Sequence, residues 1–195
     1  HGLLSLDDEN ELAIKVINRI GKIQIEVIKE TIDQGRIGAI WINDDVGHKT
    51  GLLINPERLR KYLFPFYQKI KSITESAGIP LLFHSDGNIE RIFEDLIEIG
   101  FNALHPIEPE AMDIVNVKEK IGDRMCLIGN LSLAYPLGLG SSEDVRKETS
   151  TLIKKLAPGG GYCFGSGNSV PDYIPYENWL AMRNTALKQG QYPIR

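Results

Sequence analysis

Long apolar segments, an excess of basic charge and a cysteine framework are all absent from this chain of 195 residues. Its apolar runs, such as residues 79–83, are far shorter than the roughly 20 residues that a membrane-spanning helix requires. With 22 Lys and Arg against 26 Asp and Glu, the net charge of -4 disfavours a nucleic-acid partner, which binds a basic face. Two cysteines, Cys126 and Cys163, cannot by themselves build a disulfide framework or a metal cluster. We therefore expect a cytoplasmic protein with no membrane span and no nucleic-acid partner.

The motifs of nucleotide-binding proteins and serine hydrolases are missing as well. Residues 47–50 lack the spacing of a phosphate-binding loop, and residues 165–167 lack the third glycine of a dinucleotide-binding turn. No Gly-x-Ser-x-Gly segment is present, so a serine hydrolase would have no nucleophile turn. We therefore expect no nucleotide cofactor.

What the chain does contain is a regular alternation of helix-type and strand-type hydrophobic patterns. Apolar residues at helical spacing predict helices over residues 10–35, 56–77, 88–100, 112–121, 142–156 and 176–189. Short apolar runs between them predict strands over residues 37–42, 79–83, 102–104, 125–128 and 162–164. Cys163 lies in the last strand, and we expect it to be buried in apolar packing. Three polar residues are expected to cap helices: Asn88, Asp113 and Ser142.

This alternation predicts an α/β fold, because parallel strands are joined by a crossover that is usually a helix. A doubly wound sheet and a (β/α)8 TIM barrel share the pattern. A closed barrel has eight strands, whereas about five are expected here, and the chain begins with His1 rather than Met. We therefore predict a single domain over residues 1–195 that carries the C-terminal five or so βα units of a barrel and is incomplete at its N-terminus.

Polar residues gather directly after nearly every expected strand. In a parallel barrel the C-terminal strand ends meet at one mouth, where catalytic and binding groups collect. Any one of these residues could instead cap a helix or shape a loop, and only their recurrence favours an active site. The set comprises Asn43, Asp44, Asp45, His84, Ser85, Asp86, His105, Glu108, Asn130, Ser166, Asn168 and Ser169.

His84 and Asp86 stand two residues apart at one strand end, so strand alternation places both on the same face. Together with His105 and Glu108 they could present imidazole and carboxylate groups to zinc or a similar ion. Alternatively, Asp86 orients His84 in an acid–base pair. The third alternative is a hydrogen-bonded pair that only shapes the loop, and the sequence leaves all three open.

Four short segments at these strand and helix ends read Phe-His-Ser-Asp-Gly-Asn (83–88), Leu-Ile-Gly-Asn-Leu (127–131), Gly-Asn-Ser-Val-Pro (167–171) and Pro-Tyr-Glu-Asn (175–178). In this order they resemble the uroporphyrinogen decarboxylase superfamily. That superfamily contains the decarboxylases of porphyrin biosynthesis and methyltransferases that work with corrinoid proteins. The resemblance implies a (β/α)8 barrel with its active site at the C-terminal mouth, and it suggests a homodimer.

Departures from the decarboxylase pattern favour the methyltransferase branch. Decarboxylases of the superfamily carry Phe-Asp-Ser-Trp-Ala-Gly where residues 42–47 stand here, so their substrate-binding serine falls on Asp44. Their histidine that contacts the porphyrinogen carboxylates falls on Asn168. A polycarboxylate substrate needs basic groups or helix N-termini, whereas the expected mouth is acidic. The acidic residues concerned are Asp44, Asp45, Asp86 and Glu108.

The zinc ligands of the superfamily's methyltransferases are only partly matched. Those enzymes use His-x-Cys and a later Cys, but this chain has Asp86 in place of the first cysteine and Asn168 in place of the second. A harder site of histidine and carboxylate ligands, or no metal site, is therefore expected.

The leading hypothesis is a corrinoid-linked methyltransferase that acts on a small methylated substrate such as a methoxylated aromatic. His84 and Asp86 would be catalytic and are also the candidate metal ligands, with zinc as the candidate metal. The methyl-corrinoid would be carried on a partner protein. The alternatives are a uroporphyrinogen decarboxylase of porphyrin biosynthesis and a non-catalytic partial barrel with a binding role. The expected substrate-binding residues are Asp44, Asp45, His105, Glu108, Asn130 and Asn168.

Overall fold

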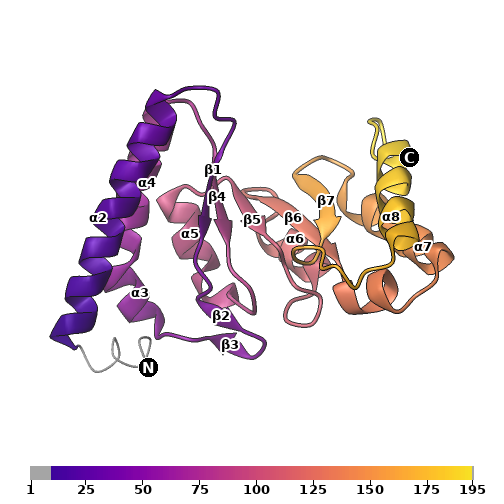
Figure 1. The fold of residues 1–195 in the computed structure, drawn as a ribbon, viewed down its shortest axis with the longest axis horizontal. Helices are drawn as coiled ribbons and strands as arrows, with labels where there is room; N and C mark the ends of the chain where they lie inside the picture. The colour runs from indigo at the N-terminus through magenta and orange to yellow at the C-terminus, as the bar shows by residue number, and fades with distance from the viewer. Residues whose placement is uncertain (1–9, 195) are drawn as a thin grey trace. The chain divides into compact units, whose positions relative to one another are not determined.

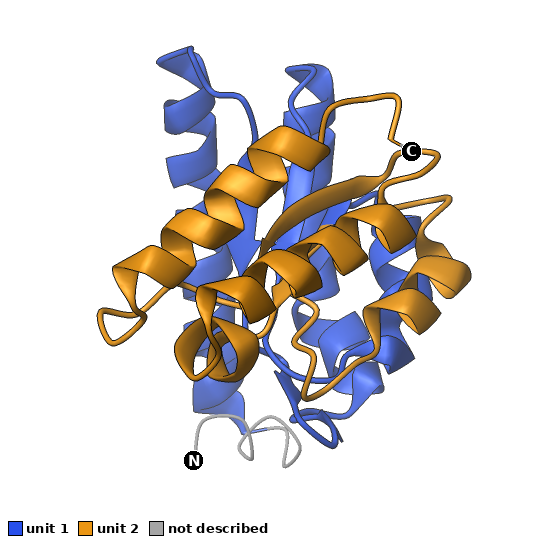
Figure 2. Ribbon diagram, turned by 90° about the vertical axis from the view of Figure 1, so that its right-hand side faces the viewer, with its two compact units in different colours: residues 1–103 blue, residues 104–195 orange. Residues whose placement is uncertain are grey.

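The structure is a computed structural model and describes residues 10–194. The chain divides into two compact units, one within residues 1–103 and one within residues 104–195 (Figure 2). Each unit contains helices and a parallel pair of strands, in the order that the hydrophobic pattern predicts. The α/β fold class is therefore confirmed, whereas the barrel and the single domain stay predictions.

The first unit begins with the long helix α2 (Glu11–Asp33), as predicted. The side-chain oxygen of Asn10 caps it by accepting hydrogen bonds from the backbone N–H groups of Leu12 and Ala13. One face of α2 is buried, and another carries an exposed apolar stripe of Leu12, Val16, Ile20, Ile23 and Val27. The elements that follow are β1 (Ile40–Asn43), β2 (Gly47–His48), β3 (Gly51–Leu52), α3 (Pro56–Tyr62), α4 (Phe64–Ser76), β4 (Leu81–His84), a 3-10 turn (Glu90–Ile92) and α5 (Phe93–Ile99) (Figure 1).

Strands β1 and β4 pair in parallel, with Ile40 opposite Leu81 and Asn43 opposite His84. Alternation buries Ile40 in β1 and Leu81 in β4, and places Asn43 and His84 on the other face. Because both strands end at the same level, the loops that follow them start side by side. This register positions the candidate site.

Strand β5 (Ala103–His105) lies at the boundary between the two units. Within the second unit β6 and β7 pair in parallel, from Leu127 opposite Tyr162 to Leu131 opposite Ser166. Helices α7 and α8 pack along each other. The elements of this unit are α6 (Ile114–Ile121), β6 (Cys126–Leu131), a helical turn (Leu133–Gly138), α7 (Ser142–Leu156), β7 (Tyr162–Ser166) and α8 (Tyr176–Gln189).

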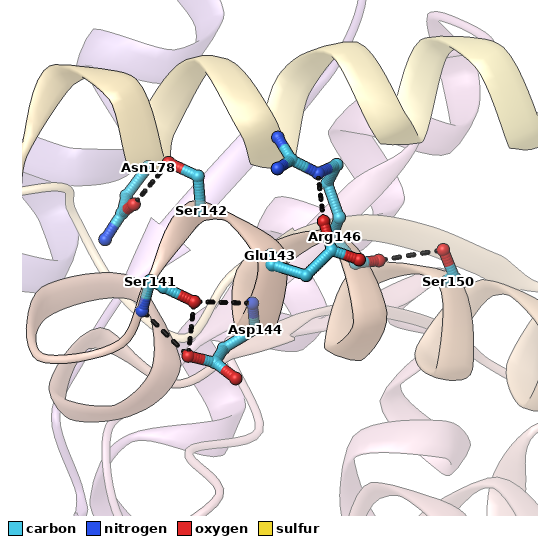
Figure 3. Close-up of polar contacts among 7 residues, drawn as sticks. All are labelled: Ser141, Ser142, Glu143, Asp144, Arg146, Ser150 and Asn178. Carbon is cyan, nitrogen blue, oxygen red and sulfur yellow. Dashed lines mark hydrogen bonds and ion pairs between the residues drawn. The ribbon is translucent and has the colours of Figure 1, made fainter.

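A buried asparagine ties α8 to the segment before α7. The Asn178 side chain is 3% exposed, and its Nδ2 donates hydrogen bonds to the carbonyl oxygens of Leu137 (3.0 Å) and Gly140 (2.9 Å). Its Oδ1 accepts a hydrogen bond from Ser142 Oγ at 2.9 Å (Figure 3). The three hydrogen bonds of this amide are therefore all made within the second unit.

The predicted cap of α7 is wrong by one residue. Ser141, not Ser142, precedes the helix in extended conformation, and its Oγ accepts a hydrogen bond from the backbone N–H of Asp144. The Asp144 carboxylate in turn accepts one from the Ser141 backbone N–H at 2.8 Å, which completes a capping box (Figure 3). Ser142 is already helical and bonds Asn178 instead. The predicted cap Asp113 is confirmed at α6. The predicted cap Asn88 is wrong: Ile89 precedes the 3-10 turn and Ile92 precedes α5, and Asn88 Oδ1 only accepts a local hydrogen bond from the backbone N–H of Glu90.

Two further expectations need correction. The helix predicted over residues 56–77 is broken at Leu63. In a continuous helix Pro65 could not donate a backbone hydrogen bond, and its ring would clash with the carbonyl group four residues earlier. Cys163 is exposed rather than buried. The hairpin of β2 and β3 was not predicted, since strands of two residues have no detectable periodicity. Within residues 10–194, no helix has the length and apolar character to cross a membrane.

Candidate functional site

Three side chains at the ends of β1 and β4 bring a nitrogen and two oxygens together. His84 Nε2 lies 3.5 Å from Asp45 Oδ1 and 3.6 Å from Asp86 Oδ1. The imidazole is largely buried, whereas Asp45 is mostly exposed, and Asp86 lies between these extremes. We call these three residues the His84 cluster. The predicted pairing of His84 with Asp86 on one side of the strand end is therefore present, and Asp45 joins it.

The loop after β1 is fastened to the loop after β4 by backbone hydrogen bonds. The Asp44 N–H donates to the carbonyl oxygen of His84 at 3.0 Å, which continues the ladder beyond the strands. The Val46 N–H donates to the hydroxyl of Ser85, a fully buried side chain, at 3.1 Å. Ser85 therefore holds a loop in place. Of the two roles expected for polar residues at strand ends, an active-site group or a residue that shapes a loop, this is the second.

Within the His84 cluster, the backbone also holds one of the carboxylates. Asp45 Oδ1 accepts a hydrogen bond from the backbone N–H of Asp86 at 3.0 Å. The same oxygen faces His84 Nε2, so the position of the Asp45 carboxylate is set by the loop that carries Asp86. This bond gives an exposed side chain a defined place beside the imidazole.

Two glycines allow the loops to approach each other so closely. A Cβ on Gly47 would lie 2.5 Å from the carbonyl oxygen of Asp86, and a Cβ on Gly87 would collide with the backbone N of His48. Gly87 also has φ of +79°, a conformation that residues with a side chain rarely adopt. The two loops therefore pack backbone against backbone.

Asp44, a predicted substrate-binding residue, is held by a tyrosine. Tyr67 Oη donates a hydrogen bond to Asp44 Oδ2 at 2.5 Å. Burial raises the pKa of Asp44; the Tyr67 hydrogen bond lowers it and the nearby Asp45 charge raises it further. Burial, followed by the Asp44 charge, raises the pKa of Tyr67 well above its ordinary value. The raised pKa of Tyr67 keeps its hydroxyl protonated, so this hydroxyl is the donor of the bond to Asp44.

Sequence reasoning missed Tyr67, because it stands among apolar residues of a predicted helix. Its ring packs at 5.7 to 5.8 Å between centroids from Phe64, Phe83 and Phe101. Since Phe83 directly precedes His84, this aromatic packing links α4 to the strand that carries the imidazole. An isolated tyrosine in an aromatic helix segment carries no signal of this role in a single sequence.

The donor set of the His84 cluster fits a divalent metal ion such as zinc. One ligand atom from each of the three residues, a nitrogen of His84 and an oxygen of each aspartate, lies within 4.8 Å of the other two. Zinc bonds of about 2.0–2.1 Å at tetrahedral angles bring neighbouring ligand atoms to about 3.3 Å, close to the two nitrogen–oxygen distances found here. One imidazole and two carboxylates are also ligands that zinc accepts, and they would leave a position for a substrate.

The other predicted site residues belong to the second unit or to its boundary. His105 ends β5, and Glu108 follows it; both are partly exposed. Asn130 is buried in β6, and its Oδ1 accepts no hydrogen bond from the residues that the structure describes. Asn168 Oδ1 accepts a hydrogen bond from the adjacent Ser169 N–H at 2.7 Å, as in a turn. Their roles in substrate binding stay predictions.

Comparisons with known proteins give a consistent family. The family model described as "Uroporphyrinogen decarboxylase (URO-D)" matches residues 4–188. The chain is 27% identical over 130 residues to the "Methylcobamide:CoM methyltransferase MtaA" of Methanosarcina barkeri, which covers 67% of this chain and 36% of that protein. It is 26% identical over 136 residues to a "Uroporphyrinogen decarboxylase" of Coxiella burnetii, which covers 68% of this chain and 36% of that protein.

A solved structure, "methyltransferase from Methanosarcina mazei", has the same fold. It superposes with a TM-score of 0.76 at 22% sequence identity, over 97% of this chain and 53% of that one. The chain therefore spans about a third of the length of these curated relatives and about half of that structure.

Proposed function

The chain belongs to the uroporphyrinogen decarboxylase (URO-D) family, and we propose that it is a methyltransferase of the corrinoid-linked type. It would pass a methyl group between a small methylated molecule, such as a methoxylated aromatic, and the cobalt of a corrinoid on a separate protein. The likeness to a protein named methylcobamide:CoM methyltransferase supports this proposal. Cytoplasmic location and a homodimer stay predictions.

The observation that carries the proposal is the His84 cluster. It sets an imidazole against two carboxylates at parallel strand ends, which is where α/β enzymes place their reacting groups. The two carboxylates repel an anion, whereas His84 Nε2, when it carries a proton, can donate a hydrogen bond to a neutral ether oxygen. A small methyl ether therefore suits such a site better than a substrate with many carboxylates.

The proposed chemistry breaks a carbon–oxygen bond of the methylated substrate. The methyl group would pass to the cobalt(I) of the partner protein's corrinoid, which supplies the electron pair of the new bond. The substrate oxygen would keep the electron pair of the broken bond and receive a proton from His84 Nε2. Asp86 and Asp45 hold the imidazole in place. Alternatively, Asp45, His84 and Asp86 would hold a zinc ion when one is bound; His84 Nε2 would then carry the metal instead of a proton, and zinc would polarise the substrate oxygen as a Lewis acid in place of that proton.

The test is methyl transfer from a methoxylated aromatic to cob(I)alamin, followed by the change in cobalamin absorbance. We expect His84→Ala to lower the rate at least about a hundredfold, since it removes the proton donor. The matched control is His48→Ala, which removes an exposed imidazole from β2, three residues after Asp45. Equal rates in wild type and His84→Ala would contradict the proposed chemistry.

Uroporphyrinogen decarboxylation is the second candidate, because several curated relatives bear that name at 25–26% identity. The acidic groups around His84 argue against it. Incubation with uroporphyrinogen and measurement of released carbon dioxide decide the matter. A chain inactive in both assays would favour the third hypothesis, a non-catalytic partial barrel with a binding role.

A further inference from the structure

Beside the His84 cluster, within the first unit, lies a pocket of about 200 Å³. Ile17, Ile20 and Gly21 of α2 form one wall, and Phe66 of α4 contributes to another. Gly21 lets the helices approach, because a Cβ there would lie 2.5 Å from the Phe66 ring. This side of the pocket is therefore apolar and shaped by close contact between α2 and α4.

The polar part of the pocket is made by Asp44, Asp45 and Tyr67, and Gln24 and Asn43 line it as well. We propose that this pocket binds a single-ring aromatic molecule with one hydroxyl group, a phenol, whose hydroxyl donates a hydrogen bond to Asp44. The inference rests on the proposed function, because the loss of a methyl group from a methoxylated aromatic leaves a phenol. It names the place where that molecule binds.

The size of the pocket suits one ring. A protein cavity of about 150 Å³ is known to take up benzene, so about 200 Å³ accommodates a ring with one or two substituents. A tetrapyrrole has four rings and does not fit. The apolar side chains of Ile17, Ile20 and Phe66 would contact the ring faces and edges.

The charges of the pocket select against an anion. Two carboxylates line it, and no Lys or Arg stands among its described lining residues. A benzoate would therefore meet Asp44 and Asp45 without a counter-charge, and its burial would be costly. A neutral hydroxyl avoids this penalty.

The contact between Tyr67 and Asp44 shows how Asp44 can accept a hydrogen bond from a phenol group. Tyr67 donates its phenolic hydroxyl to Asp44 Oδ2, and that bond holds the carboxylate in place. A carboxylate has acceptor capacity for several such bonds, so a second phenolic hydroxyl can be accepted by the same group. Asp45 belongs both to the pocket lining and to the His84 cluster, so a molecule bound here lies next to the proton donor.

Ligand-observed NMR titration with phenol, benzoate and benzylammonium tests the inference without any methyl transfer. We expect phenol to bind, and benzoate to bind at least about tenfold more weakly because of the two carboxylates. Tighter binding of benzylammonium than of phenol would overturn the assignment in favour of a cation. Equal binding of benzoate and phenol would overturn the role of Asp44.

Variants locate the binding. Ile20→Trp would fill the pocket from a half-exposed position and is expected to weaken phenol binding about tenfold, the loss typical of a missing contact worth 1.4 kcal/mol. The control is Leu12→Trp, an exposed position of the same apolar stripe that does not line the pocket. Asp44→Leu is expected to weaken phenol binding by a similar factor.

Unchanged phenol binding in Ile20→Trp would contradict the inference, even if Asp44→Leu failed to fold. Methyl transfer without phenol binding would leave the proposed function standing and remove only this pocket from it. Phenol binding without methyl transfer would support this pocket and contradict the proposed function.

Discussion

The parallel pair β1/β4 in the first unit and the pair β6/β7 in the second are built alike, but the polar residues around them serve different ends. After β1 and β4, Asp45, His84 and Asp86 direct a nitrogen and two oxygens toward one another. Near β6 and β7, Asn168 closes a turn and Asn178 ties a helix to a loop. Similar strand ends therefore do not imply similar chemistry. In the first unit three side chains are gathered, whereas in the second Asn168 and Asn178 make local structural bonds, and the buried Asn130 Oδ1 has no hydrogen-bond partner among the described residues.

The largest effect should come from exchanging one carboxylate of the first unit. We expect Asp86→Asn to lower both methyl transfer and the affinity for Co²⁺, read from its visible absorption, by about a hundredfold, since a charged ligand becomes neutral. Asn168→Ala, its counterpart in the second unit, should lower either quantity by less than about tenfold. Equal losses in the two variants would break the comparison.

A stability effect should mark the second unit. Asn178→Ala leaves the buried carbonyl oxygen of Leu137, the partly buried one of Gly140 and the Ser142 hydroxyl without their partner. We expect a loss of about 3 kcal/mol in the free energy of unfolding, measured by urea denaturation. The control is Asn116→Ala at an exposed position of α6, which should change it by no more than about 0.5 kcal/mol. A loss below that of the control would show that the buried amide is dispensable.

A smaller effect distinguishes two adjacent serines. Ser141→Ala removes the cap of α7 and should cost about 1 kcal/mol of unfolding free energy. Ser142→Ala removes one hydrogen bond to Asn178 but places alanine in the first helical turn, so its cost should be about half as large. Thermal denaturation of both variants gives the order. The reverse order would restore Ser142 as the cap.

The smallest effect concerns the two sulfur atoms of the second unit, which lie 3.8 Å apart. Burial, with a further contribution from Cys163, raises the pKa of Cys126 to about 11. Only about 0.1% of this thiol is ionised at pH 8, so it is a poor metal ligand. We expect its alkylation by iodoacetamide, followed by peptide mass spectrometry, to speed up about tenfold per pH unit from pH 8 to 10.

The same shift has a consequence for stability. Cys126 holds its proton more tightly in the folded chain, so its contribution is complete below pH 9 and is lost as the pH rises toward about 11. Rapid alkylation of Cys126 at pH 7 would contradict the raised pKa. It would also make a thiolate site in the second unit tenable.

Much of the fold could be predicted because long segments with a regular hydrophobic period specify their own secondary structure. Helices α7 and α8 have the predicted bounds, and α2 begins and ends within two residues of the bounds predicted for it. The break at Leu63 was missed because a proline near a helix start is tolerated, and only tertiary structure decides whether a new helix begins there. Ser141 and Ser142 are chemically equal candidates, and backbone conformation alone separates them.

The proximity of His84 and Asp86 could be predicted, but not the contacts that support it. Strand alternation was expected to place both on one face; β4 ends at His84, and the loop after it still brings Asp86 Oδ1 to 3.6 Å from His84 Nε2. The contributions of Tyr67 and of the Asp86 backbone N–H depend on contacts between segments far apart in the sequence, which no local pattern encodes. Asp45 was grouped with substrate-binding residues, whereas the structure brings it to the imidazole.

The backbone seam at Gly47 and Gly87 limits how this site can be altered. Since neither position has room for a side chain, random mutagenesis of the two loops should yield almost no active clones with a substitution at either glycine. Transplanting one loop from a relative would present a mismatched surface to the other. A redesign of substrate preference would therefore have to exchange both loops together, as a single cassette.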